Sequence, residues 1–182
     1  IHERLVGSEM CIRDSGYGLG SEKNDVALED LAALTDVFYF GGTKCGALFG
    51  EAVVITADAL KKRFKAYMKQ NGAVLAKGWL LGLQFHCLLE HDLYFTATRR
   101  ADALAMKLRE VFAEQGIPFW VESFTNQQFV ILSDVQKETL EKRYIFEPMG
   151  KSADGGNIAR FCTSWATTEE EVQTLIDDLR TL

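Results

Sequence analysis

A lysine in a glycine-rich connection is the residue of this sequence whose type and surroundings suggest chemistry most clearly. Lys44 follows Gly41-Gly42-Thr43 and precedes Cys45-Gly46-Ala47, and small residues of this kind let a backbone and a ligand approach closely. A lysine that loses its proton near neutral pH can act as a nucleophile, and partial burial beside a cationic group favours that loss. Taken alone, the pattern also fits a solvated lysine in a glycine turn.

An arginine near the other end of the chain is the second candidate. Arg160 lies in the segment Ile158-Ala159-Arg160-Phe161-Cys162-Thr163-Ser164-Trp165. The planar fork of a guanidinium matches a carboxylate with two parallel hydrogen bonds, so Arg160 could bind an acidic ligand. It could equally be the structural ion-pair partner of a glutamate.

Other polar residues carry weaker signals. Thr43 could place a hydroxyl near a ligand bound at Lys44, and a turn-forming threonine explains it almost as well. Lys77, in Leu75-Ala76-Lys77-Gly78-Trp79, also fits a helix surface. His86 and His91 are five residues apart and share no helix face, and the four cysteines form no CxxC pair, so neither a metal site nor a disulfide framework is predicted.

The hydrophobic pattern predicts strands on both sides of Lys44, followed by long helices and then a mixed segment of strands and helices. A glycine-rich turn is expected at 16–21, and Thr168 with Glu171 predicts a capping box at the start of the last helix. This order suggests the end of an α/β domain leading into a smaller α+β domain. The predicted helices are 25–34, 57–70, 73–90, 95–115, 135–141 and 168–182, and the predicted strands are 36–40, 52–56, 119–123, 128–132, 144–146 and 157–162.

Composition excludes several classes of partner. The chain has 182 residues and a net charge of −6, which argues against nucleic-acid binding because phosphate neutralisation needs a clustered basic surface. No apolar run approaches the roughly 20 residues that span a bilayer, so no membrane partner is expected. The scattered cysteines fit a reducing cytoplasm.

Residues 1–15, Ile1 to Ser15, have neither a helical nor an alternating period. They resemble the translation of a sequencing-library adapter, and we exclude them from reasoning about the fold. On this interpretation the gene continues upstream of Gly16 and the chain is a fragment.

The segment Phe38-Tyr39-Phe40-Gly41-Gly42-Thr43-Lys44-Cys45-Gly46-Ala47-Leu48-Phe49-Gly50 resembles the strand and turn that carry the cofactor lysine in the threonine aldolase / aromatic amino acid β-eliminating lyase family. These are pyridoxal 5'-phosphate (PLP) enzymes of fold type I, and the similarity runs from Gly16 to the C-terminus. It implies that Lys44 forms the internal Schiff base and later moves protons. It further implies that Arg160 binds the substrate α-carboxylate, that Thr43 lies near the cofactor, and that Lys77 reaches a neighbouring subunit's cofactor phosphate, although Trp79 stands where a polar or basic residue is usual.

The resemblance implies an α/β fold: the C-terminal part of a fold-type-I PLP-dependent transferase, with the end of the large PLP-binding domain at 16–70 and long helices plus the small α+β domain at 71–182. The expected reaction is the cleavage of a β-hydroxy-α-amino acid, such as threonine, to glycine and an aldehyde by a homodimer or homotetramer. The aspartate that pairs with the pyridinium nitrogen, the ring-stacking residue and the phosphate-binding glycines do not precede Gly16 here, so the fragment is expected to be inactive. Two alternatives stay open: a PLP-dependent β-eliminating lyase, and a non-catalytic α+β interaction domain.

Overall fold

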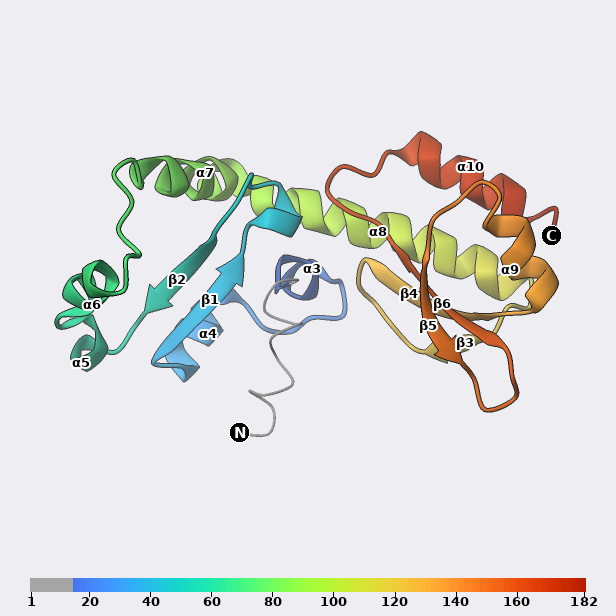
Figure 1. Ribbon diagram of the computed structural model, residues 1–182, viewed down its shortest axis with the longest axis horizontal. Coiled ribbons are helices and arrows are strands. Elements are labelled where there is room, and N and C mark those ends of the chain that lie inside the picture. Colours follow the sequence, from blue (N-terminus) through green and yellow to red (C-terminus); the bar gives the residue numbers. More distant parts are fainter. Residues whose placement is uncertain (1–14) are drawn as a thin grey trace. The chain divides into compact units, whose positions relative to one another are not determined.

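The computed structural model describes residues 15–182, in two compact units (Figure 1). The prediction that residues 1–15 derive from an adapter falls almost entirely outside the described part, because residues 1–14 are not described. One unit comprises Asn24–Ala97 with the described residues up to Gly20, and the other comprises Ser21–Lys23 with Thr98–Leu182. The predicted division into 16–70 and 71–182 refers to the domains of a longer enzyme and stays a prediction.

The first unit is built around a two-stranded antiparallel sheet in which Val37 pairs with Ile55 and Gly41 with Glu51. Both strands were expected from their β-branched and aromatic residues. Its elements are α3 (Ser15–Gly20), α4 (Leu28–Leu34), β1 (Val37–Gly41), the 3-10 turn η1 (Thr43–Cys45), β2 (Glu51–Ile55), α5 (Asp58–Lys61), α6 (Phe64–Gln70), α7 (Trp79–Leu89) and the 3-10 turn η2 (Glu90–Asp92).

Three predictions for the first unit are wrong. The glycine-rich segment at 16–21 is helix α3 and not a turn, because Tyr17 is buried there and gives the segment a packed side chain. The single helix expected at 57–70 is divided into α5 and α6 by Arg63, whose φ of 66° does not fit a helix. The helix expected to begin at residue 73 begins at Trp79, after a turn in which the Gly78 amide donates to the Leu75 carbonyl.

The second unit packs helices against a four-stranded antiparallel sheet of order β3-β4-β6-β5. Helix α8 begins in the first unit and contributes its residues from Thr98 onward to the second. The predicted strands at 119–123, 128–132 and 157–162 are confirmed, with the first ending at Val121. The elements are α8 (Leu93–Glu114), β3 (Phe119–Val121), β4 (Gln127–Leu132), α9 (Asp134–Leu140), β5 (Glu147–Lys151), β6 (Asn157–Cys162) and α10 (Glu169–Leu179).

Alternation along β4 and β6 separates a core face of the sheet from a second face, whose side chains on these strands are mostly half-buried and which we call the open face. On the core face Val130 pairs with Ala159, both nearly inaccessible, and the helices α8 and α10 seen beside the sheet in Figure 1 bury Phe112 and Ile176 in the same cluster. A residue one position along either strand faces the opposite way. Arg160 therefore belongs to the open face.

The strand predicted at 144–146 is wrong, because β5 comprises Glu147–Lys151. Tyr144 and Phe146 pack against the core cluster, and Phe146 stacks on Phe161 with 4.9 Å between ring centroids. Their aromatic character therefore reflects side-chain packing and not strand pairing. Strand β5 is exposed along its whole length, and its pairing with β6 is irregular between Pro148 and Gly150.

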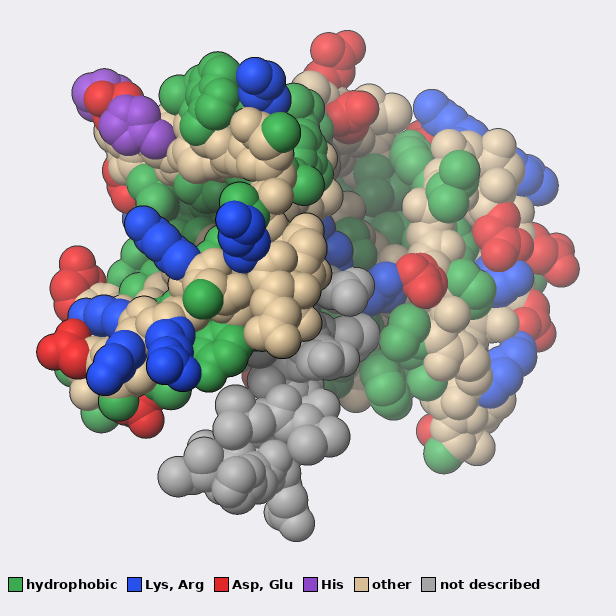
Figure 2. All heavy atoms as spheres, turned by 60° about the vertical axis from the view of Figure 1, so that its left-hand side comes forward, with side chains coloured by type: hydrophobic (Ala, Val, Ile, Leu, Met, Phe, Trp, Pro, Cys, Tyr) green, Lys and Arg blue, Asp and Glu red, His purple; other side chains and the backbone are tan. Residues whose placement is uncertain are grey.

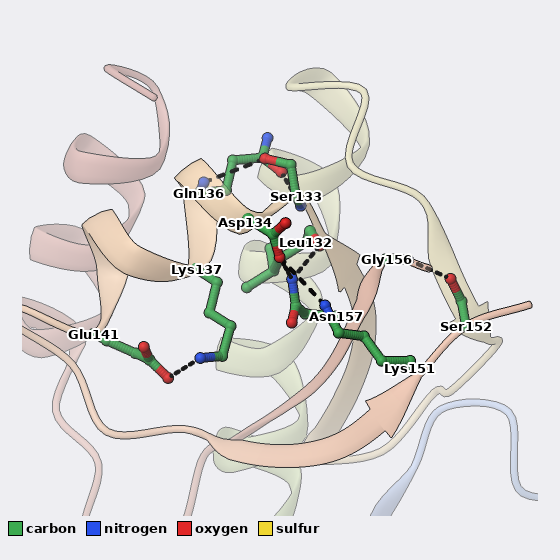
Figure 3. Close-up of polar contacts among 10 residues, drawn as sticks. All are labelled: Leu132, Ser133, Asp134, Gln136, Lys137, Glu141, Lys151, Ser152, Gly156 and Asn157. Carbon is green, nitrogen blue, oxygen red and sulfur yellow. Dashed lines mark hydrogen bonds and ion pairs between the residues drawn. The ribbon is translucent and has the colours of Figure 1, made fainter. Parts of the chain in front are cut away.

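Helix α9 is attached to the sheet by an acidic residue in its first turn (Figure 3). Asp134 accepts hydrogen bonds from the side-chain amide of Asn157 at 2.8 Å and from the Lys151 ammonium at 3.2 Å. The bond from Asn157, followed by that from Lys151, lowers the pKa of Asp134. The contribution of the ionised Asp134 carboxylate to stability is therefore fully present above the pKa that this group has in the unfolded chain. It is lost as pH falls through the lower pKa of Asp134 in the folded protein.

The N-terminus of α9 is a capping box, and its removal should cost stability. Ser133 accepts from the Gln136 amide at 3.2 Å, and the Gln136 side chain accepts from the Ser133 amide at 2.9 Å. We expect Ser133→Ala to lower the free energy of unfolding by about 1 kcal/mol in urea denaturation. Val135→Ala on the same helix is the control, because Val135 is exposed. Equal losses in the two variants would contradict the capping role.

Candidate active site

The connection between β1 and β2 places Lys44 on the one-turn helix η1. The Gly42 carbonyl accepts from the amides of Cys45 and Ala47, both at 2.9 Å, and the Gly42 amide donates to the Gly50 carbonyl at 3.3 Å. Gly46 and Gly50 have φ values of 107° and 97°, which side-chain-bearing residues rarely adopt. The glycines therefore make a closed turn from which the Lys44 side chain projects.

Two buried tyrosines fix this turn to the rest of the first unit. The Tyr17 hydroxyl donates to the carbonyl of Lys44 itself, and the Tyr94 hydroxyl donates to the Gly41 carbonyl at 2.8 Å. Both side chains are 1% exposed or less. Sequence reasoning missed both residues, because their partners are backbone atoms far away in the chain. The aromatic residue inside the run Gly16-Tyr17-Gly18 was the available signal for Tyr17.

Helix α7 supports the other side of the turn. The Gln84 side-chain oxygen accepts from the backbone amides of Leu48 at 2.7 Å and Phe49 at 3.4 Å. Phe85 packs edge-on against Phe40 of β1, with 5.8 Å between ring centroids. The backbone on both sides of Lys44 is thus bonded to side chains of α3, α7 and α8, which limits how far the lysine can move.

Lys44 and Thr43 are exposed and line a cavity of about 270 Å³ together with Gly41 and Glu51. An amine and a hydroxyl beside glycine backbone suit a cofactor that is attached through an aldehyde and has further oxygen atoms to satisfy. The residues present therefore fit PLP at this point. Lys77 lies in the turn before α7, is exposed and does not line this cavity.

Gly42 leaves no room for a side chain, so its replacement should damage the turn. A Cβ atom there would lie 2.7 Å from Phe85 Cζ and 2.8 Å from Ala47 Cβ. We expect Gly42→Ala to lower the free energy of unfolding of the first unit by about 1–3 kcal/mol and to reduce PLP attachment at Lys44. Gly82→Ala on α7 is the matched control, because its Cβ would meet nothing within 4 Å. Denaturation and borohydride trapping measure the two effects, and wild-type behaviour of Gly42→Ala would contradict them.

Arg160 lies on the open face of the second unit's sheet, where its guanidinium has two protein partners. Its Nη2 donates to the Glu147 carboxylate at 2.6 Å, and its Nη1 donates to the Gln127 side chain at 3.3 Å. Its Nε is buried with no hydrogen-bond partner among the described residues. The ion-pair interpretation is thus realised with Glu147, while the Nε donor is left for another acceptor.

The structure places the candidates in both units. Lys44, Thr43 and Lys77 belong to the first unit, and Arg160 belongs to the second. Of these four, Lys44 and Thr43 line the cavity described above, and Lys77 and Arg160 do not. Within residues 15–182, no group of three or more His, Cys, Asp or Glu side chains could hold a metal ion, and no helix is both long and apolar enough to cross a membrane.

No family model matches the chain. The low specificity L-threonine aldolase of Pseudomonas aeruginosa is 32% identical over 150 residues, and that of a Pseudomonas species is 30% identical. Each alignment covers 80% of this chain and 41% of the relative. The threonine aldolase of Leishmania major superposes with a TM-score of 0.87 at 38% identity, covering 93% of this chain and 49% of that one.

More distant structures share the fold alone. The 8-amino-7-oxononanoate synthase of Francisella tularensis superposes with a TM-score of 0.50 at 14% identity. The predicted fold class, the C-terminal part of a fold-type-I PLP-dependent transferase, is thereby confirmed. The chain spans less than half the length of the threonine aldolases it matches. Over its matched part, the predicted resemblance to the threonine aldolase family is thereby confirmed.

Proposed function

We propose that this chain is part of a longer PLP-dependent lyase that cleaves a β-hydroxy-α-amino acid, such as threonine, to glycine and an aldehyde. The observation that carries the proposal is Lys44, which projects from a glycine turn into a cavity in a chain related to threonine aldolases. When bound, PLP supplies a conjugated ring that accepts the electrons released as the substrate bond breaks. We place the protein in a reducing cytoplasm.

The chain's own residues divide the remaining tasks. Lys44 Nζ would hold the cofactor covalently. When free, the same amine would take the proton of the substrate β-hydroxyl and deliver a proton to the α-carbon. The anchored backbone on both sides of the lysine fixes the point from which its side chain extends. Thr43 offers a hydroxyl to the cofactor, and Lys77 is proposed as a contact to the cofactor phosphate of a neighbouring subunit.

Arg160 is proposed to bind the substrate carboxylate. Its buried Nε has no partner among residues 15–182, whereas Nη2 is bonded to Glu147. A carboxylate that takes both Nε and Nη2 must therefore displace or share with Glu147. The glutamate then competes with the substrate and holds the guanidinium in position when no substrate is bound.

Product analysis on the complete gene product tests the reaction. Acetaldehyde and glycine from threonine are expected, whereas pyruvate with ammonia would indicate the β-eliminating alternative. A complete protein with no visible band from lysine-bound PLP in excess cofactor would favour the non-catalytic domain. We expect no turnover from the 182-residue chain, because it spans only part of its relatives.

Helix α7 provides the surface for the proposed homodimer or homotetramer. Phe85 and Leu88 are buried, but Trp79, Leu80 and Leu83 are 64%, 44% and 46% exposed. A helix that is apolar on all sides is usually buried on all sides, and Figure 2 shows hydrophobic side chains gathered beside the histidines of α7 and η2.

Introducing a charge on this surface should weaken association between subunits. We expect Trp79→Glu in the complete protein to shift the mass measured by light scattering towards smaller species. His86→Gln is the control, because His86 is also exposed on α7. An unchanged mass for Trp79→Glu would contradict the assignment.

A further inference from the structure

A buried carboxyl group in the second unit has no hydrogen-bond partner in the described part of the chain. Asp102 of α8 is 5% exposed, and both of its carboxyl oxygens are unpaired among the described residues. Burial raises the pKa of Asp102 to about 8. The nearby Asn126 backbone amide, which lacks the geometry of a full hydrogen bond, acts in the opposite direction. Buried acceptors are normally satisfied, so this carboxyl group calls for a donor.

Asp102 lines a cavity of about 240 Å³ within the second unit. Its two carboxyl oxygens have almost no accessible surface, so a ligand reaches them when the side chain turns into the cavity. The apolar part of the lining is formed by Ala103, Met106 and Phe124. Ser21 fixes one side, because its hydroxyl donates to the Phe124 carbonyl at 2.8 Å. The charged side chains of the lining are all exposed and form its rim: Glu22, Lys23, Arg99, Lys107 and Glu110.

The charged side chains of this lining indicate which net charge a ligand should have. With Asp102 neutral, the lining has three cations and two carboxylates, and once Asp102 ionises the two signs balance. A ligand without net charge then leaves the site neutral. The unpaired acceptor at Asp102 requires a donor, and the basic rim favours an anionic group at the opposite end. At about 30 Å³ for each water molecule, the cavity holds roughly eight waters, enough for a small organic molecule.

We propose that this cavity binds a small zwitterion with an apolar body, whose ammonium group faces Asp102 and whose carboxylate faces the cationic rim. The apolar chain contacts Met106 and Phe124. This site is separate from Lys44, which lines another cavity in the other unit. The proposal therefore does not depend on the catalytic function.

Binding should release a proton, because an ammonium beside Asp102 stabilises its ionised form. With a pKa of about 8, Asp102 is mostly protonated at pH 7. Each binding event at pH 7 therefore releases nearly one proton, and the release disappears well above pH 8. The acidic and basic groups that face Asp102 across the cavity are those of the rim.

Calorimetric titration of the 182-residue chain with norvaline tests the proposal. We expect saturable binding. The heat of binding at pH 7 should differ between phosphate and Tris by nearly the difference in ionisation enthalpy of the two buffers, which corresponds to the release of nearly one proton. Butylamine and pentanoate, which each have one of the two charges, should bind at least about tenfold more weakly. Asp102→Asn should remove the proton release and weaken norvaline binding by a similar factor. Glu138→Gln, outside the cavity, should change neither.

A second substitution tests the other end of the ligand. Lys107→Gln should weaken the binding of norvaline but not of butylamine, and it leaves the buried carboxyl group in place if Asp102→Asn does not fold. Absence of saturable binding by the wild-type chain would overturn the proposal. So would unchanged norvaline affinity in folded Asp102→Asn, or binding without proton release.

Discussion

Lys44→Ala should abolish the covalent attachment of PLP, and this is the largest effect we expect. Lys44 combines an accessible amine with an anchored backbone and lines a cavity. After PLP loading and borohydride reduction, the label should be found on the peptide that contains Lys44. In the complete protein, losing the proton-transfer group alone should lower kcat by about 10²–10⁴-fold, and losing the covalent attachment should lower it further.

Lys69→Ala is the matched control for this experiment. Lys69 is an exposed lysine of the same unit that does not line the Lys44 cavity. It should leave the label on Lys44 unchanged. If the label appears on another peptide, or survives in Lys44→Ala, the assignment is wrong.

Arg160→Gln in the complete protein should lower kcat/KM for amino-acid substrates by roughly 30- to 1000-fold, mainly through a higher KM. The physical reason is the loss of a charge-assisted contact to a carboxylate, which typically costs about 2–4 kcal/mol at a partly buried site. The guanidinium side chain is 23% exposed, so it is largely shielded from water.

Glu147→Gln separates substrate binding from a structural ion pair. Glu147 holds Nη2 of Arg160 at 2.6 Å and is itself 60% exposed, so the pair should contribute at most about 1 kcal/mol to stability. If Arg160 binds substrate, Glu147→Gln should leave KM unchanged or lower it, because a competitor is weakened. If Arg160 is purely structural, both variants should lose the same small stability and neither should change KM. Denaturation and steady-state kinetics on both variants distinguish the two cases.

The sequence predicted the elements whose signals are local. The strands around Lys44 follow from β-branched and aromatic residues, and the capping box at Thr168 and Glu171 is confirmed, with the Glu171 amide donating to the Thr168 hydroxyl at 3.2 Å. Family resemblance, and not periodicity, identified the turn around Lys44, because a glycine turn with a lysine has many uses.

Features that depend on distant packing could not be predicted. Helix α3 contains three glycines, which disfavour a helix, but Tyr17 is buried in it, and a Cβ at Gly16 would lie 2.8 Å from both Cys45 and Tyr94. Strand β5, with a proline and a glycine, has no strand propensity of its own and exists because β6 pairs with it. The buried state of Asp102 likewise depends on long-range packing that leaves no pattern in the sequence.

The irregular strand β5 has a consequence for association between chains. An edge strand with regular unpaired amides is a template for strand addition and aggregation. Pro148 has no amide hydrogen, and Gly150 adopts a φ of 106° beside the irregularity in pairing. This edge therefore resists extension by a strand of a second molecule. At this edge of the sheet, association between copies through helix surfaces is therefore not accompanied by strand addition.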